Sequence, residues 1–183
     1  TDWNNGELGS FLVEITSKIF KKDDDRTGKR VIDIILDVAR SKGTGRWTSQ
    51  DAMDLATPVP VIDVAVSMRQ LSGKEEERKK AAEVYGRADR KVSANKEQFI
   101  ADVRKAYYAG MIVSYAQGLA QIRAASDEYG YGGNLEDAAR IWRGGCIIRA
   151  TFLGDIKAAF DKNPNLENLL LDDFFAQAVQ KAQ

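Results

Sequence analysis

The stretch "YYAGMIVSYAQGLAQIRAAS", residues 107–126, decides the fold class of this chain. It forms the interior of a predicted helix that runs from about residue 96 to residue 126 without a proline. Gly110, Gly118 and many alanines stand there among aromatic and aliphatic side chains, so the helix is apolar nearly all round. Small residues allow neighbouring helices to approach closely. We therefore predict a long central helix that is buried among others.

The segments on either side repeat the helical period of apolar residues. Helices are predicted in residues 6–22 and 31–38 before the long helix, and at about 135–143, 146–161 and 166–182 after it. The chain has only three prolines and no alternating runs of apolar and polar residues, which would indicate half-buried strands. The sequence therefore predicts an all-α, multi-helix fold in a single domain, residues 1–183.

The composition argues against several classes of protein. Basic and acidic residues each number 27, and a formal charge of zero argues against a protein that coats nucleic acid or an anionic membrane. There is no histidine, the commonest general base and metal ligand, and Cys146 is the single cysteine, so no disulfide framework exists. No run approaches the ~18 apolar residues of a membrane span. We expect a cytoplasmic protein and, because it starts at Thr1, a fragment of a longer one.

The loop "SKGTGRWTSQ", residues 41–50, contains more charged and hydroxyl side chains than a turn between helices needs. Thr48 followed by Asp51 predicts a capping box that opens a helix at "DAMDLA". Glycines 43 and 45 permit positive φ and leave backbone N–H groups uncovered, while Lys42 adds a charge and Thr44 a hydroxyl donor. Together these groups suit a phosphate. A tight turn with a solvated Lys42 and a core anchor at Trp47 is the alternative, and short glycine motifs alone favour it.

A second anomaly lies in the helix predicted in "PVIDVAVSMRQLSGK", residues 60–74. Arg69 falls inside its apolar arc, where a guanidinium is costly unless it meets an anion. A core ion pair with an acid such as Glu14, a snorkelling side chain and a ligand site all remain open. Arg149 poses the same puzzle among apolar neighbours, and we predict a structural or interface pair for it. The adjacent run "KEEERKK" predicts only i, i+4 ion pairs on a solvated helix.

Taken in order, these motifs resemble the helical C-terminal domain of 6-phosphogluconate dehydrogenases. The resemblance rests on "KGTGRWTSQDAMDLATPVP" with the Arg69 helix directly after it, and it is loosest from about residue 73 to residue 95. It continues through "WNNGELGSFLVEITSKIF", "SYAQGLAQIRAASDEYG", "IWRGGCIIRATFLGDI" and "NPNLENLLLDDFF".

The resemblance implies that Lys42, Thr44 and Arg69 bind the phosphate of 6-phosphogluconate. It further implies a homodimer whose parent enzyme, in the pentose phosphate pathway, uses NADP and no metal to decarboxylate its substrate oxidatively to ribulose 5-phosphate. NADP would be bound mainly by an N-terminal Rossmann domain, which we expect to be absent here together with the catalytic residues and a C-terminal tail. Arg46 stands where the family usually has lysine, which keeps the charge.

We therefore expect the substrate-binding and dimerisation domain of an oxidoreductase, inactive by itself. The alternative is a helical interaction module that keeps the fold and binds no sugar phosphate. Lys42, Thr44 and an inward Arg69 together favour the first hypothesis, because an interaction module needs none of them.

Overall fold

The computed structural model describes residues 1–86 and 95–182 of the chain. Within these ranges the structure is helical, and its only β contacts are two isolated bridges. The elements are η1 (Asp2–Asn5), α1 (Phe11–Ile19), α2 (Val31–Ile34), α3 (Thr44–Asp54), α4 (Pro60–Ser72), α5 (Glu75–Tyr85), α6 (Lys96–Tyr129), α7 (Leu135–Trp142), α8 (Leu153–Lys162), η2 (Leu169–Leu171) and α9 (Asp173–Gln180). The predicted all-α class is confirmed.

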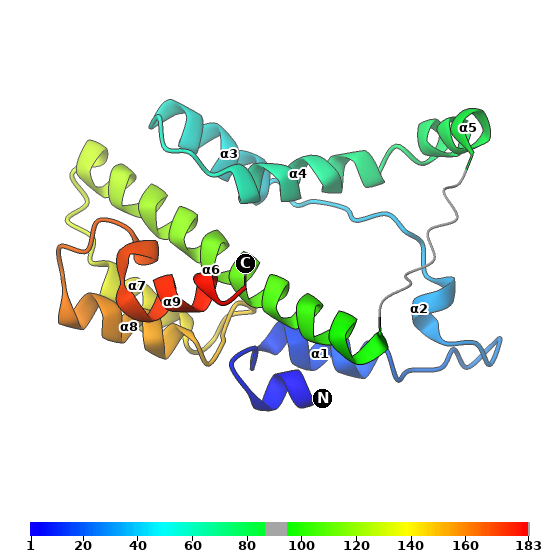
Figure 1. Cartoon of the computed structure of the whole chain (residues 1–183). Helices are drawn as coiled ribbons and strands as arrows, with labels where there is room; N and C mark the ends of the chain where they lie inside the picture. The colour runs from blue at the N-terminus through cyan, green and yellow to red at the C-terminus, as the bar shows by residue number, and fades with distance from the viewer. Residues whose placement is uncertain (87–94, 183) are drawn as a thin grey trace.

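Helix α6 is the predicted long helix, and it runs diagonally through the middle of Figure 1. Asn95 caps its N-terminus by accepting from the N–H groups of Glu97 and Gln98, and Gly130, with φ of 67°, ends it. Only its C-terminal part is buried as predicted, because the first buried side chain is that of Ile112. Its first turns carry exposed apolar side chains instead.

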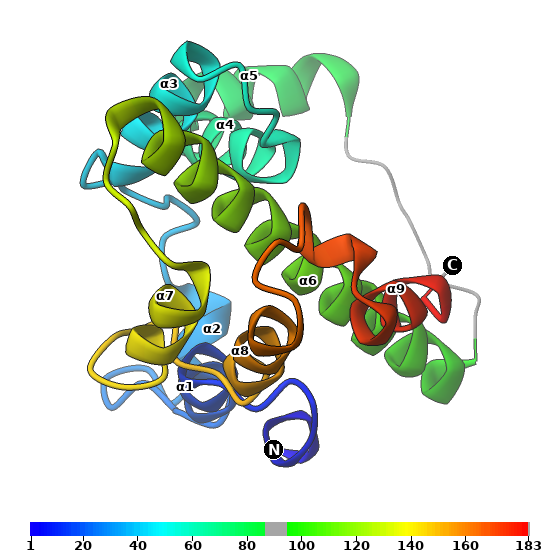
Figure 2. The ribbon, with the colours of Figure 1, turned by 90° about the vertical axis from the view of Figure 1, so that its left-hand side faces the viewer.

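The hydrophobic core lies where α7, α8 and α9 pack on one side of α6 (Figure 2). Phe152 is 1% exposed and meets the ring of Tyr115 edge-on, with 4.8 Å between centroids. Phe175 meets Phe152 in the same way at 5.8 Å. This aromatic cluster joins α6, α8 and α9, since rings in edge-on contact stabilise one another beyond the area they bury.

Several predicted helix boundaries are wrong, and the clearest case is α8. The helix begins at Leu153 rather than at residue 146. Residues ahead of it pair with the segment before α1 instead: the N–H of Phe11 donates to Arg149 O, and the N–H of Thr151 donates to Gly9 O. These backbone bonds hold the segment away from helical geometry, although its apolar spacing fits a helix.

Two other predicted helices are shorter than expected. Helix α2 ends at Ile34, because Ile35 takes an extended conformation with ψ of 148°. Its neighbour Leu36 is exposed, so no packing surface supports a longer helix there. The predicted helix at 166–182 is divided, since Asp172 caps a new helix, α9, after the short turn η2.

Arg149 packs on an aromatic ring rather than against a carboxylate. Its guanidinium carbon lies 4.1 Å from the centroid of the Phe11 ring, a cation–π contact. Its Nη1 also donates to the carbonyl of Cys146 at 3.3 Å. The charge is therefore accommodated within the chain.

Helices α3 and α4 form a hairpin that α6 holds by polar contacts. Gln117 on α6 accepts from the N–H of Val61 at 3.0 Å. The buried Gln121 donates to the carbonyl of Thr48 at 2.9 Å and to the carboxylate of Asp51 at 2.7 Å. These bonds fix both helices of the hairpin on the C-terminal half of α6.

Tyr115 makes the stability of the fold depend on pH in the alkaline range. Its hydroxyl donates to Ile148 O at 2.9 Å, and burial raises the pKa of Tyr115 from its ordinary 10.0 to about 12. The unfolded chain loses this proton first, so the stabilisation is complete below pH 10 and is lost as the pH rises towards 12. We expect the free energy of unfolding in urea to fall more steeply above about pH 10 in the wild type than in Tyr115→Phe. Parallel pH profiles would contradict this.

Candidate functional site: an anion pocket at the start of helix α3

The loop at residues 40–43 ends in a helix N-terminus that no side chain caps. Gly43 occupies the N-cap position with φ of 104°, a left-handed conformation that favours glycine. Helix α3 then begins at Thr44, so the predicted capping box is wrong. The hydroxyl of Thr48 lies inside the helix and donates to Thr44 O at 2.9 Å. The first N–H groups of α3 are therefore left for another acceptor.

The second predicted glycine serves packing rather than a turn. Gly45 has no positive φ, and a Cβ placed on it would lie 3.0 Å from Cγ2 of Val66 on α4. This is tighter than most Cβ contacts, so a side chain at residue 45 would require Val66 to shift by a few tenths of an ångström. This contact brings the N-terminus of α3 beside the middle of α4.

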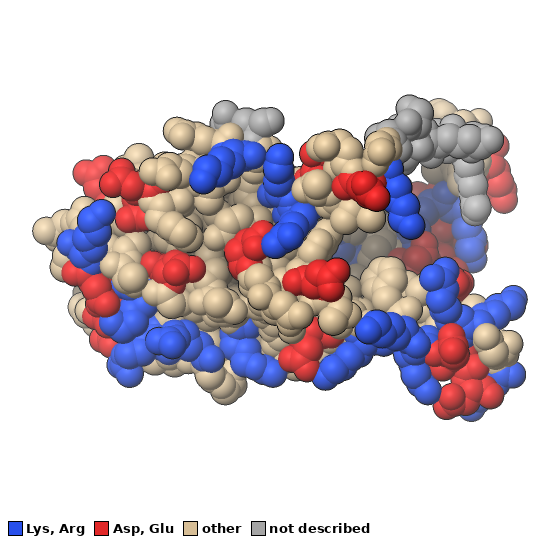
Figure 3. Space-filling model, turned by 60° about the horizontal axis from the view of Figure 1, so that its bottom comes forward, with Lys and Arg blue, Asp and Glu red and all other residues tan. Residues whose placement is uncertain are grey.

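Helices α3 and α4 and the loop before them enclose a pocket of about 930 Å³, which we call the anion pocket. Four of the described side chains that line it are cationic and none is acidic. The cations are Arg40, Lys42, Arg46 and Arg69. On the face that Figure 3 shows, positive and negative side chains are interspersed. The positive potential is thus local, in a chain whose formal charge is zero.

All three predicted site residues line this pocket. Lys42 and Thr44 come from the loop and the first residue of α3, and Arg69 comes from α4. Trp47, the proposed core anchor, is 56% exposed, and its ring lies against Gly43. The loop therefore differs from a plain turn whose tryptophan enters the core.

Arg69 is exposed, so the prediction of an inward guanidinium is wrong. The apolar arc of α4 is itself largely uncovered: Val64 is 61% and Met68 56% exposed. Glu14, considered as a partner for Arg69, pairs with Lys18 on its own helix. The Nε of Arg69 instead donates to the backbone carbonyl of Arg40 at 2.8 Å.

Sequence reasoning missed two features of the pocket. Arg40 contributes both a lining side chain and the carbonyl that receives Arg69, but nothing in the local pattern singled it out. Arg46 was noted only because the family usually has lysine at this position, although it supplies the fourth cation of the pocket. Its place in the same short loop as Lys42 and Thr44 was the available signal.

The composition of the pocket suits an anionic group. Cationic donors, a hydroxyl and free helix N–H groups match the several oxygens of a phosphate. The described lining residues include no carboxylate, cysteine or tyrosine that would act as a general base. In residues 1–86 and 95–182, no cluster of three acidic or cysteine side chains is placed to hold a metal ion. None of the helices in those ranges is long and apolar enough to cross a membrane.

The fold and the pocket together define an all-helical domain with a cationic pocket beside a helix N-terminus. The family model "6-phosphogluconate dehydrogenase, C-terminal domain" matches residues 1–183, and the chain belongs to this family.

Similar proteins support that assignment over the whole chain. The NADP(+)-dependent, decarboxylating 6-phosphogluconate dehydrogenase of Bacillus subtilis is 51% identical over 183 residues, which are 100% of this chain and 39% of that protein. The decarboxylating enzyme of Escherichia coli is 47% identical over 184 residues, again 100% of this chain and 39% of the relative. This chain therefore spans about two-fifths of the length of these relatives.

A solved structure has the same fold. The 6-phosphogluconate dehydrogenase of Plasmodium falciparum matches with a TM-score of 0.94 at 39% identity, over 99% of this chain and 39% of that one. Its description covers an apo form and complexes with NADP+ and with 6-phosphogluconate.

Proposed function

We propose that this chain is the substrate-binding domain of an enzyme that oxidatively decarboxylates 6-phosphogluconate to ribulose 5-phosphate with NADP, in the pentose phosphate pathway. The observation that carries the proposal is the anion pocket, with four cations and no acid among its described lining residues. Its relatives of about 50% identity are dehydrogenases of this kind.

Within that proposal, the pocket holds the end of the substrate that does not react. Lys42 contributes a point charge to the phosphate, Thr44 a hydroxyl donor, and Arg69 its two terminal nitrogens. The free N–H groups of α3 add the positive end of a helix. Binding energy from a remote phosphate orients the reacting carbons and so lowers the barrier elsewhere. Because the described lining has no carboxylate, cysteine or tyrosine for acid–base catalysis, this chain alone is proposed to be inactive.

The residues of this chain do not fit NADP by the usual arrangement. A Rossmann site needs a glycine-rich turn between a strand and a helix. The described part of the chain contains isolated bridges but no such strand. We propose that other parts of the enzyme bind the cofactor.

We also propose a cytoplasmic homodimer, from apolar side chains that this chain leaves uncovered. On α4, Val64 and Met68 are exposed, and on the first turns of α6, Phe99, Val103 and Tyr107 are exposed. Apolar side chains that are exposed together on one helix often mark protein–protein contacts. The single cysteine, Cys146, fits a reducing compartment.

Amide NMR shifts of this 183-residue chain test the proposed phosphate site directly. Addition of 6-phosphogluconate is expected to shift the N–H signals of Thr44, Gly45 and Arg46, because these groups face the phosphate. Gluconate, which lacks the phosphate, is the matched control and should leave them in place. Lys42→Ala should weaken the binding about tenfold, the usual worth of one charged hydrogen bond. Equal responses to both ligands, or none, would favour the interaction module.

A further inference from the structure

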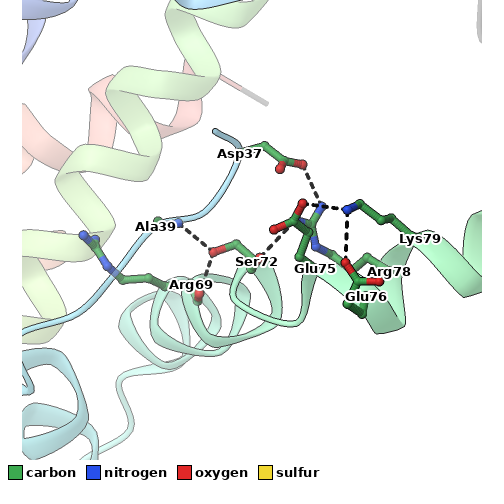
Figure 4. Close-up of polar contacts among 8 residues, drawn as sticks. All are labelled: Asp37, Ala39, Arg69, Ser72, Glu75, Glu76, Arg78 and Lys79. Atoms are coloured by element: carbon green, nitrogen blue, oxygen red, sulfur yellow. Dashed lines mark hydrogen bonds and ion pairs between the residues drawn. The ribbon is translucent and has the colours of Figure 1, made fainter. Parts of the chain in front are cut away.

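The segment at residues 37–40, which leads into the anion pocket, has no helix or strand of its own. One side chain at the end of α4 fixes its path, as Figure 4 shows. The hydroxyl of Ser72 accepts from the N–H of Ala39 at 2.9 Å and donates to Arg69 O at 2.7 Å. Ser72 therefore ties the backbone of the segment to the backbone of Arg69 itself.

A second tie comes from α5. Nη1 of Arg78 donates to the carboxylate of Asp37 at 2.8 Å, and its Nη2 donates to Ser72 O at 3.0 Å. In Figure 4 this guanidinium lies between the segment and the end of α4. The contact also holds the pKa of Asp37 below its usual range. The side chain of Arg78 thus links three parts of the chain: the segment at residues 37–40, the end of α4 and the start of α5.

These contacts determine where the carbonyl of Arg40 lies. It follows Ala39 directly, and it receives the Nε of Arg69 at 2.8 Å. A guanidinium is planar, so a bond at Nε fixes the plane in which both Nη groups lie. Neither Nη of Arg69 donates a hydrogen bond to any residue that the structure describes. The edge formed by the two Nη groups can donate two hydrogen bonds to one phosphate. It is therefore oriented, and it has no other acceptor among the described residues.

We infer that Ser72 and Arg78 are positioning residues, which hold the Arg40 carbonyl so that Arg69 is oriented for phosphate before the substrate arrives. This inference rests on the proposed function, because it assigns Arg69 a phosphate to bind. Neither residue lines the anion pocket. Their effect passes through Arg69. Without them, its long side chain would lose rotational freedom about several bonds when the phosphate binds, and this lost entropy would weaken binding.

A double-mutant cycle in the complete dehydrogenase that contains this domain tests the inference. Ser72→Ala is expected to raise the KM for 6-phosphogluconate about 3- to 10-fold, the usual cost of ordering one long side chain. The kcat and the KM for NADP should stay within about twofold. In an Arg69→Ala background, Ser72→Ala should have no further effect, because the side chain that it orients is gone.

Two further variants separate positioning from general stability. Ser72→Thr keeps the hydroxyl and should restore the KM. Lys79→Ala is the matched control: it breaks the ion pairs with Glu75 and Glu76 on the same helix as Arg78, seen in Figure 4, and should leave the KM unchanged. If Ser72→Ala does not fold, Arg78→Lys replaces it in the cycle, since it keeps the charge and loses one of the two contacts.

The outcomes distinguish this inference from the proposed function. An unchanged KM in Ser72→Ala and Arg78→Lys, or an equal rise with and without Arg69, overturns the positioning role while a defect in Arg69→Ala still supports the phosphate site. An unchanged KM in Arg69→Ala itself removes the phosphate site, and the inference fails with it.

Discussion

Replacing Arg69 by alanine is expected to raise the KM for 6-phosphogluconate by about 10- to 150-fold in the complete enzyme. A hydrogen bond to a charged group contributes about 1.5–3 kcal/mol, which corresponds to that range. The KM for NADP should change little, since the described residues around Arg69 include no strand that leads into a glycine-rich turn, as a Rossmann dinucleotide site needs. The kcat should fall less than the KM rises, because the phosphate is bound in both the ground and the transition state.

Steady-state kinetics with both substrates varied measure this effect. Arg30→Ala is the matched control, because Arg30 is an exposed arginine paired with Asp33 and lies outside the anion pocket. Arg69→Lys should recover part of the loss, since it keeps the charge but offers no planar pair of donors. An Arg69→Ala enzyme with an unchanged KM for the sugar phosphate would refute the proposed site.

Replacing Phe152 by alanine is expected to lower the free energy of unfolding by about 3–5 kcal/mol, the usual cost of deleting a buried aromatic ring. Phe152 is 1% exposed and its ring contacts Tyr108, Tyr115 and Phe175. Its removal leaves a cavity between α6, α8 and α9 that rigid helices do not close. Since a domain of this size has about 5–15 kcal/mol in total, this loss is a large fraction of its stability.

Urea unfolding followed by far-ultraviolet circular dichroism measures the difference. Phe174→Ala is the control, because Phe174 is the neighbour of Phe175 but is 52% exposed. It should cost less than about 1 kcal/mol, as substitutions at exposed positions usually do. Equal losses in the two variants would mean that the aromatic cluster is not the centre of the core.

The helices that the sequence predicts correctly are those with strong local signals. Helix α6 has a long run of good helix formers without proline, begins at the side-chain cap Asn95 and ends at Gly130. Helix α7 begins after the cap Asn134 and has the clearest apolar face. In both cases the period of the apolar residues and the residues at the helix ends indicate the same helix. Contacts with other parts of the chain therefore do not override the local preference.

The errors occur where contacts distant in sequence compete with local preference. The segment before α8 follows a helical period, but it pairs with the backbone before α1. The capping box at Thr48 has the right residue types, but Gly43 begins the helix earlier with a conformation that glycine adopts easily. A local pattern cannot indicate which of two possible partners the backbone will take.

The sequence by itself determined the helical class, the central helix and the chemistry of the loop, with Lys42, Thr44 and two permissive glycines in one short stretch. The resemblance already grouped Arg69 with Lys42 and Thr44, but only the tertiary structure decided that Arg69 reaches the pocket along an exposed face. The physical reason is one of range. Helical period and charge are properties of adjacent residues, whereas the direction in which Arg69 points depends on the α3–α4 contact at Gly45 and on the carbonyl of Arg40.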